Sequence, residues 1–140
     1  YLYEGEWNDT KTSWSSMTNA KFIFDGNLMT GENKVMWGTV SGQNMRVYAY
    51  APYINSQNLA QQVTGAPKLS FTPETDVTEQ VDLIGASAVV SVAESKGKSI
   101  ALGFRHALTG IKFRAGFACT VKSVMISGVY GSGVYSIGEG

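Results

Sequence analysis

Apolar residues in this sequence recur in short alternating runs, and apolar residues at helical spacing are nearly absent. The clearest run covers residues 99–104, where Ile100, Leu102 and Phe104 share one parity. Gly, Asn, Ser and Asp separate such runs. A period of two indicates strands, and many short strands divided by turn residues are typical of sandwiches and barrels. The sequence therefore predicts an all-β fold, a two-sheet β-sandwich of about seven to nine mainly antiparallel strands with few short helical turns.

Turn residues and prolines set the limits of the predicted strands. Asp25-Gly26 is a turn pair, and Pro52 and Pro73 each stop a strand because proline cannot donate to a ladder. The predicted strands are residues 21–24, 35–40, 45–50, 68–71, 80–86, 88–92, 99–104, 121–130 and 134–137. We also expect one helical turn at residues 58–63 and a hairpin loop at residues 94–98.

A change of parity follows the run at residues 99–104. Even-numbered positions carry the pattern through His106 and Leu108, and odd-numbered positions carry it at Ile111 and Phe113. A strand cannot change parity without a bulge or bend, and Gly110 at the switch makes a kink cheap. We expect one core to contain the apolar members of this pattern, which are Ile100, Leu102, Phe104, Leu108, Ile111 and Phe113.

Composition and charge are those of one folded domain. The chain has 140 residues, of which 44% are hydrophobic and only 16% charged. A chain of this length can bury a core without a disulfide or a metal, and its one cysteine, Cys119, cannot form an intrachain disulfide. Eleven basic residues balance eleven acidic ones, so long-range attraction to nucleic acid or anionic lipid is weak.

The polar start of the chain differs from the remainder. Residues 1–20 are rich in Thr, Ser and Asn, which predicts an N-terminal arm followed by one β-sandwich domain at residues 21–140. Neither an initiator Met nor the pattern of a signal peptide is present at the start, so we interpret the chain as a processed or truncated form. The longest weakly polar stretch, residues 84–93, is too short to span a membrane.

Residues suited to catalysis or to cofactor binding do not form a recognisable pattern. His106 is the single histidine, no Gly-x-Ser-x-Gly elbow exists, and no metal-ligand spacing recurs. Gly97-Lys98-Ser99 resembles the end of a phosphate loop, but a strand is predicted after it where a helix is needed. We therefore expect no catalytic residue, no metal and no cofactor, and we interpret His106 as a buried structural histidine with a hydrogen-bond partner.

Aromatic residues leave one alternative open. Trp37, Tyr48, Tyr50 and Tyr53 could stack on sugar rings if they lay exposed on one face, as in a glycan-binding β-sandwich module. The competing interpretation is that Trp37, Tyr48 and Tyr50 pack in a core or in cross-strand pairs, which is commoner for aromatic residues in strands. Exposure of the rings separates the two interpretations.

Four segments follow one another along the chain: residues 47–52 (VYAYAP), 80–86 (QVDLIGA), 100–113 (IALGFRHALTGIKF) and 124–129 (VMISGV). They resemble the N-terminal domain of the fimbrillin-like family, the surface pilins and fimbrial adhesins of Gram-negative anaerobes. Together they cover roughly residues 35 to 130, and the resemblance lies in their order and spacing as well as in each segment. The residues that carry the signature are Tyr48, Tyr50, Pro52, Gln80, Asp82, Phe104, His106, Leu108, Ile111 and Phe113.

This resemblance implies a transthyretin-like β-sandwich without enzymatic activity, usually followed in the family by a second domain. It implies a structural subunit or tip-type adhesin of a bacterial fimbria, exported through the outer membrane and lipid-anchored as a precursor. Its partners would be other fimbrial subunits, joined by strand exchange, and a host or bacterial surface protein or glycan. We expect the 140-residue chain by itself to be monomeric or weakly associated.

Overall fold

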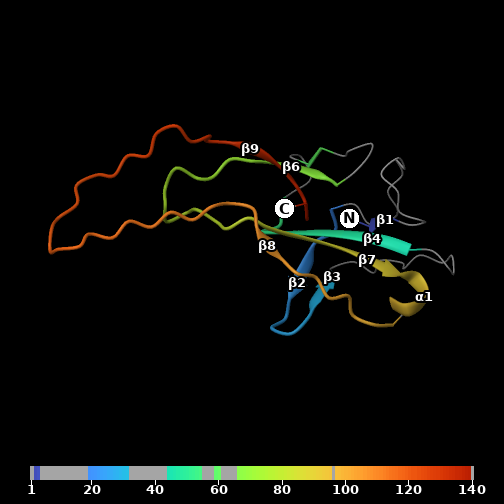
Figure 1. The fold of residues 1–140 in the computed structure, drawn as a ribbon. Coiled ribbons are helices and arrows are strands. Elements are labelled where there is room, and N and C mark those ends of the chain that lie inside the picture. The colour runs from blue at the N-terminus through green and yellow to red at the C-terminus, as the bar shows by residue number, and fades with distance from the viewer. Residues whose placement is uncertain are drawn as a thin grey trace.

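The computed structural model describes residues 2–3, 19–31, 44–54, 59–60, 66–95 and 97–139. In these ranges the chain forms nine strands and one short helix, α1 (Val92–Ser95) (Figure 1). The strands make three antiparallel sheets of four, two and three strands. The predicted all-β class is therefore confirmed.

The central sheet has the order β1-β4-β7-β8. Strands β4 (Asn44–Ala51) and β7 (Ile84–Ser91) pair along their whole length, from Asn44↔Ser91 to Ala51↔Ile84. The outer strands β1 (Leu2–Tyr3) and β8 (Arg105–His106) are only two residues each. β4 ends one residue before Pro52, as the sequence predicted.

Two smaller sheets accompany the central one. Strands β5 (Leu59–Ala60), β6 (Lys68–Phe71) and β9 (Gly133–Ser136) form the three-stranded sheet. Strands β2 (Phe22–Phe24) and β3 (Met29–Gly31) form a hairpin. The predicted Asp25-Gly26 turn is present there: Asp25 Oδ1 accepts hydrogen bonds from the amides of Asn27 (2.9 Å) and Leu28 (2.7 Å).

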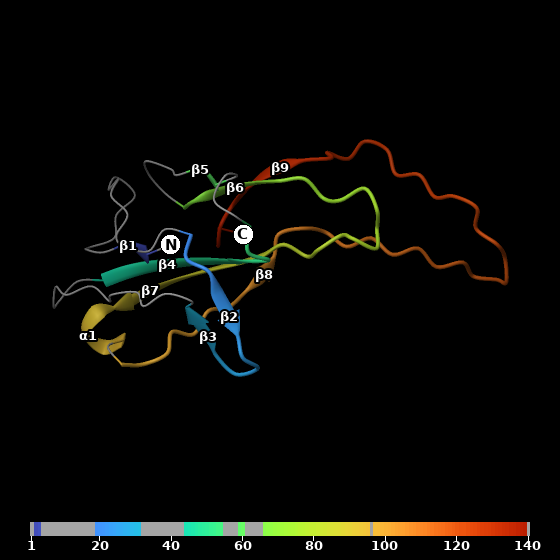
Figure 2. The same cartoon turned by 180° about the vertical axis from the view of Figure 1, so that it is seen from behind.

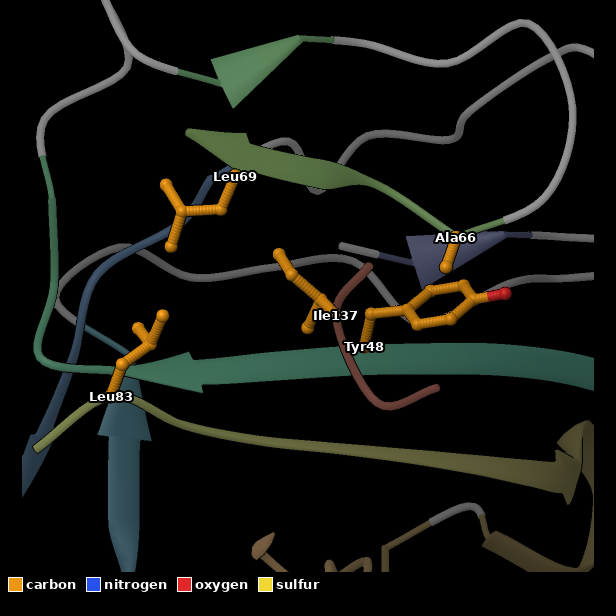
Figure 3. Close-up of a cluster of buried hydrophobic side chains, with 5 residues drawn as sticks. All are labelled: Tyr48, Ala66, Leu69, Leu83 and Ile137. Atoms are coloured by element: carbon orange, nitrogen blue, oxygen red, sulfur yellow. The ribbon is translucent and has the colours of Figure 1, made fainter. Parts of the chain in front are cut away.

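The main core lies between the three-stranded sheet and the central sheet (Figure 3). Leu69 of β6 and Ile137, just after β9, point toward Tyr48 of β4 and Leu83, just before β7. Full burial of a leucine or isoleucine side chain contributes about 1.5–3 kcal/mol, so these contacts hold the two sheets face to face. The arrangement is consistent with the predicted two-sheet sandwich.

The opposite face of β4 is covered by the β2–β3 hairpin. Met45 is fully buried there, packed against Ala20, Phe22, Val47 and Val90. Alternation along β4 sends Met45 and Val47 to this face and Tyr48 to the main core.

Some predicted elements differ in detail. The two strands predicted at residues 80–86 and 88–92 are the single strand β7, and α1 lies where the hairpin loop was expected to begin. Leu59–Ala60 is a strand, so the helical turn predicted at residues 58–63 is wrong there. The start of the chain contributes a strand, β1, which the sequence did not predict. The strand predicted at residues 35–40 lies outside the described residues.

The largest difference concerns the segment between α1 and β9. Residues 99–104 and 121–130 form no strand, and the chain after β8 runs far out from the sheets and returns to β9 (Figures 1 and 2). Phe104, Leu108, Ile111 and Phe113 are exposed, whereas Ile100 and Leu102 are half-buried. The predicted core of these six residues is therefore wrong.

The six residues form no core because alternation in a sequence predicts an extended chain but does not predict a second strand that pairs with it. A ladder needs a second strand in register, and β7 offers β8 only Ile84 and Gly85. Gly110, predicted to kink a strand, lies in a segment without ladder pairing and has no positive φ. The parity switch at Gly110 therefore marks no bulge.

Candidate functional site

One edge of β4 is open along half of its length. β1 pairs only with Val47 (through Leu2) and Arg46 (through Tyr3), while β7 occupies the other edge of β4 throughout. Among the described residues, no strand pairs with the remaining outer edge at residues 48–51. Backbone N–H and C=O groups on an open edge can pair with a further strand.

A groove of about 630 Å³ adjoins this part of β4, and each of the residues 47–51 contributes to its lining. The β2–β3 hairpin and residues 98–104 supply its other walls, through apolar side chains such as Leu28, Met29 and Phe104. We call this feature the β4 groove. Its walls are mostly apolar, with an extended backbone along one side.

The three described tyrosines of the predicted aromatic set differ in exposure. Tyr48 is buried in the main core (2% exposed), Tyr50 is half-buried, and Tyr53 is 43% exposed. The Tyr50 hydroxyl donates to Asn19 Oδ1 (2.6 Å) and accepts from the Ile54 amide (3.3 Å). Burial raises the pKa of the Tyr50 hydroxyl above its usual value, so it stays a neutral donor.

The positions of these tyrosines do not favour stacking on a sugar. Tyr48 and Tyr50 are engaged in packing and hydrogen bonds, so Tyr53 is the one described member of the set with an exposed ring. Trp37 lies outside the described residues. A platform for a sugar needs exposed rings, and the tyrosines seen here favour the packing interpretation.

His106 and Asp82 form a contact at the outer edge of the central sheet. His106 Nδ1 lies 2.6 Å from Asp82 Oδ2, with 74% of the histidine side chain and 54% of the aspartate side chain exposed. Beside it, the Ala107 amide donates to the Leu83 carbonyl (2.8 Å). The expected polar partner of His106 is present, but its expected burial is wrong, because β8 is a two-residue edge strand that leaves this side chain exposed.

The remaining signature residues do not gather at one place. Pro52 follows β4 and is half-buried, and Gln80 Nε2 donates to the Glu74 carbonyl (2.8 Å) within the loop before β7. Phe104 lines the β4 groove, while Ile111 and Phe113 lie in the exposed segment between β8 and β9. The signature thus marks positions along the fold, and its role as a set stays a prediction.

Residues of the β2–β3 hairpin that line the groove were missed by the sequence reasoning. Leu28 and Met29 flank a turn and carry no motif, and only the hairpin's position over β4 brings them to the groove. In the described part of the chain, no group of three or more His, Cys, Asp or Glu residues could hold a metal ion. Nor is any helix there long and apolar enough to cross a membrane.

Comparison with known families gives one match. The family model described as fimbrillin-like matches residues 1–140, the whole chain. No curated protein and no solved structure matches. The chain belongs to the fimbrillin-like family, a family of structural and adhesive fimbrial subunits that are located at the cell surface and are not enzymes.

Proposed function

We propose that this chain is a structural subunit or tip-type adhesin of a cell-surface fimbria and that it joins other subunits by strand exchange at the β4 groove. The observation that carries the proposal is the open edge of β4 at residues 48–51, beside a groove with apolar walls. Membership of the fimbrillin-like family supports assembly with other fimbrial subunits.

Strand addition suits this geometry for a physical reason. An incoming strand would pair its backbone with N–H and C=O groups along the outer edge of β4 and place alternate side chains against the apolar walls. Backbone pairing supplies affinity and the side-chain pockets supply selectivity. The short strand β1 already pairs with the first part of the same edge, so β1 sets the register in which a longer strand would continue.

The same proposal includes a location and a route. A fimbrial subunit must cross both membranes of a Gram-negative cell, and we propose that the precursor is lipid-anchored before it assembles at the outer surface. The partner at the tip would be a surface protein or glycan. A protein partner is favoured over a stacked glycan because Tyr48 is buried and the Tyr50 hydroxyl is already hydrogen-bonded.

The experiment mixes full-length processed subunits and looks for a ladder of denaturant-resistant oligomers on a gel. The informative variant is Ala49→Trp, which places an indole in the groove and should abolish the ladder. The matched control is Val89→Trp on β7, an exposed position that does not line the groove and should leave the ladder intact. Removal of residues 1–20 tests whether β1 competes for the edge.

Two results would contradict strand exchange at this edge. One is a full ladder in Ala49→Trp with the fold retained by circular dichroism. The other is the absence of a ladder from the unmodified subunits both with and without residues 1–20. Adhesion by the isolated subunit would then be the better account.

A further inference from the structure

The segment at residues 109–132 leaves the sheets (Figure 1) and carries exposed apolar side chains. We call this segment the arm; it is separate from the N-terminal residues 1–20. Nine of its large apolar side chains are exposed, among them Phe113, Phe117, Met125 (92%) and Tyr130 (98%). No residue of the arm belongs to a strand or helix. Contiguous exposed apolar surface of this kind usually marks an interaction site.

The arm is also basic. Lys112, Arg114 and Lys122 lie in it, and it contains no Asp or Glu. None of these three cations makes an ion pair with a described acidic residue. The arm therefore presents positive charge and apolar surface together.

A second exposed segment has the opposite charge. Residues 72–83, which we call the acidic loop, contain Glu74, Asp76, Glu79 and Asp82 and no Lys or Arg. Its exposed apolar side chains are Val77 and Val81. The loop projects from the same side of the molecule as the arm (Figures 1 and 2), and the two meet at their bases through Asp82 and His106.

Hydrogen bonds give the acidic loop a fixed shape. Asp76 Oδ1 accepts from the Thr78 amide (2.8 Å) and hydroxyl (2.7 Å), and the Glu79 amide donates to the Asp76 carbonyl (3.1 Å). The bonds from Thr78 lower the pKa of Asp76 below its usual value, so this residue keeps its charge at neutral pH. A preformed loop loses little conformational freedom when it is bound.

We propose that the arm of one copy of this chain docks on the acidic loop of a second copy, and that the reciprocal contact closes a two-fold dimer. Each chain carries both halves of a complementary pair, which is the requirement for an isologous interface. Arm and loop start from neighbouring points, because Asp82 of the loop contacts His106, three residues before the arm. The proposed dimer differs from our expectation from the sequence that the chain by itself is monomeric or weakly associated.

A lipid surface is the competing partner for a basic, apolar arm. The acidic loop beside the base of the arm would be repelled by an anionic membrane, and the formal net charge of the chain is zero. A partner that carries both negative charge and apolar groups fits better, and the acidic loop of a second copy has both.

The test uses two charge-reversed variants. One reverses the arm (Lys112→Glu, Arg114→Glu, Lys122→Glu), and the other reverses the loop (Glu74→Lys, Glu79→Lys, Asp82→Lys). Analytical ultracentrifugation of the reduced protein, to exclude disulfides through exposed Cys119, measures association. We expect the unmodified chain to dimerise, with a dissociation constant roughly tenfold higher in high salt, because exposed charges are screened. Each variant alone should be monomeric, and an equimolar mixture of the two should form one-to-one dimers.

Matched controls keep the result interpretable. Glu94→Lys and Lys68→Glu each reverse one charge at an exposed position outside the arm and the acidic loop, and both should leave the dimer intact. The arm variant Lys112→Arg, Arg114→Lys, Lys122→Arg preserves charge and should dimerise even if the reversed variant folds poorly.

Several outcomes would overturn the proposal. One is that the unmodified chain is monomeric at about 100 μM, a concentration well above an ordinary specific dissociation constant. The others are a dimer that persists in both charge-reversed variants, or an equimolar mixture of the two variants that stays monomeric. Arm-dependent binding to vesicles of anionic lipid without dimers would assign the arm to a membrane. The proposed dimer is reversible and salt-sensitive, whereas strand exchange gives denaturant-resistant ladders. The two measurements therefore test the two proposals independently of each other.

Discussion

His106 illustrates how a single residue can be partly understood from its chemistry. A lone imidazole with a carboxylate in the same fold is expected to find a polar partner, and it contacts Asp82 at 2.6 Å. Its exposure depends on how far β8 extends along β7, which is two residues. No local pattern around His106 contains that information.

Exposure determines the expected cost of removing this contact. We predict that His106→Ala lowers the free energy of unfolding by less than about 1 kcal/mol, because exposed ion pairs are weak. A double-mutant cycle with Asp82→Ala, followed by urea denaturation, measures the coupling between the two side chains. A loss of several kcal/mol would mean that the histidine is buried in solution.

Adding a methyl group at Gly138 should lower the free energy of unfolding more than removing the His106 side chain does. Its φ is +71°, and an added Cβ would lie 2.6 Å from the carbonyl carbon of Ala86 in β7. Gly97 has the same φ of +71° with open space around it. We predict that Gly97→Ala costs about 1 kcal/mol, the ordinary cost of this backbone conformation, and that Gly138→Ala costs clearly more. Equal shifts in the denaturation midpoint would show that β7 can move away from residue 138.

At the scale of elements, the β2–β3 hairpin depends on its turn. Asp25 accepts from the Asn27 and Leu28 amides, and these bonds lower its pKa below the usual 3.8. A carboxylate whose folded pKa is depressed stabilises the fold above its unfolded pKa, and this stabilisation is lost as the pH falls through the folded pKa. The turn should therefore weaken only in acid.

We predict that the hairpin amides of the unmodified chain broaden or shift in NMR spectra only in acid, as the pH falls through the depressed pKa of Asp25. Asp25→Ala should show the weakened hairpin already at neutral pH. Asp25→Asn keeps an acceptor oxygen without the titration, so its hairpin should be insensitive to acid in this range. An acid response that persists in Asp25→Asn would assign the effect to another carboxylate.

Local signals predicted some elements and failed for others in a consistent way. Strands β2, β4, β6 and β9 were predicted because each combines β-favouring residues with a turn or proline at its end. The segments at residues 99–104 and 121–130 carry similar patterns but have no partner strand. Of the signature residues, Tyr48, Tyr50 and Phe104 line the β4 groove, whereas the groove itself arises from packing between distant segments.

On the scale of the whole molecule, the chain divides into packed sheets and a projecting arm. The two ends of the arm are held in different sheets, β8 beside β7 and β9 beside β6. An extended backbone without ladder pairing is accessible to proteases, while paired strands resist them.

Limited trypsin digestion should therefore cut first after Lys112, Arg114 or Lys122 and only later after Lys68, which lies in β6. The two fragments should stay together, because β9 remains paired with β6. Protection of the arm should increase with protein concentration if the arm docks on a second copy. Early cleavage after Lys68 would mean that the three-stranded sheet is not formed in solution.

The composition of the main core sets the order in which this protein can fold. Tyr48, Leu69 and Leu83 meet only when Ile137 arrives from the far end of the sequence. The pairings β4–β7 and β6–β9 are likewise long-range, which is typical of chains that fold in milliseconds to seconds. During synthesis the chain therefore cannot close its core until Ile137 has emerged from the ribosome.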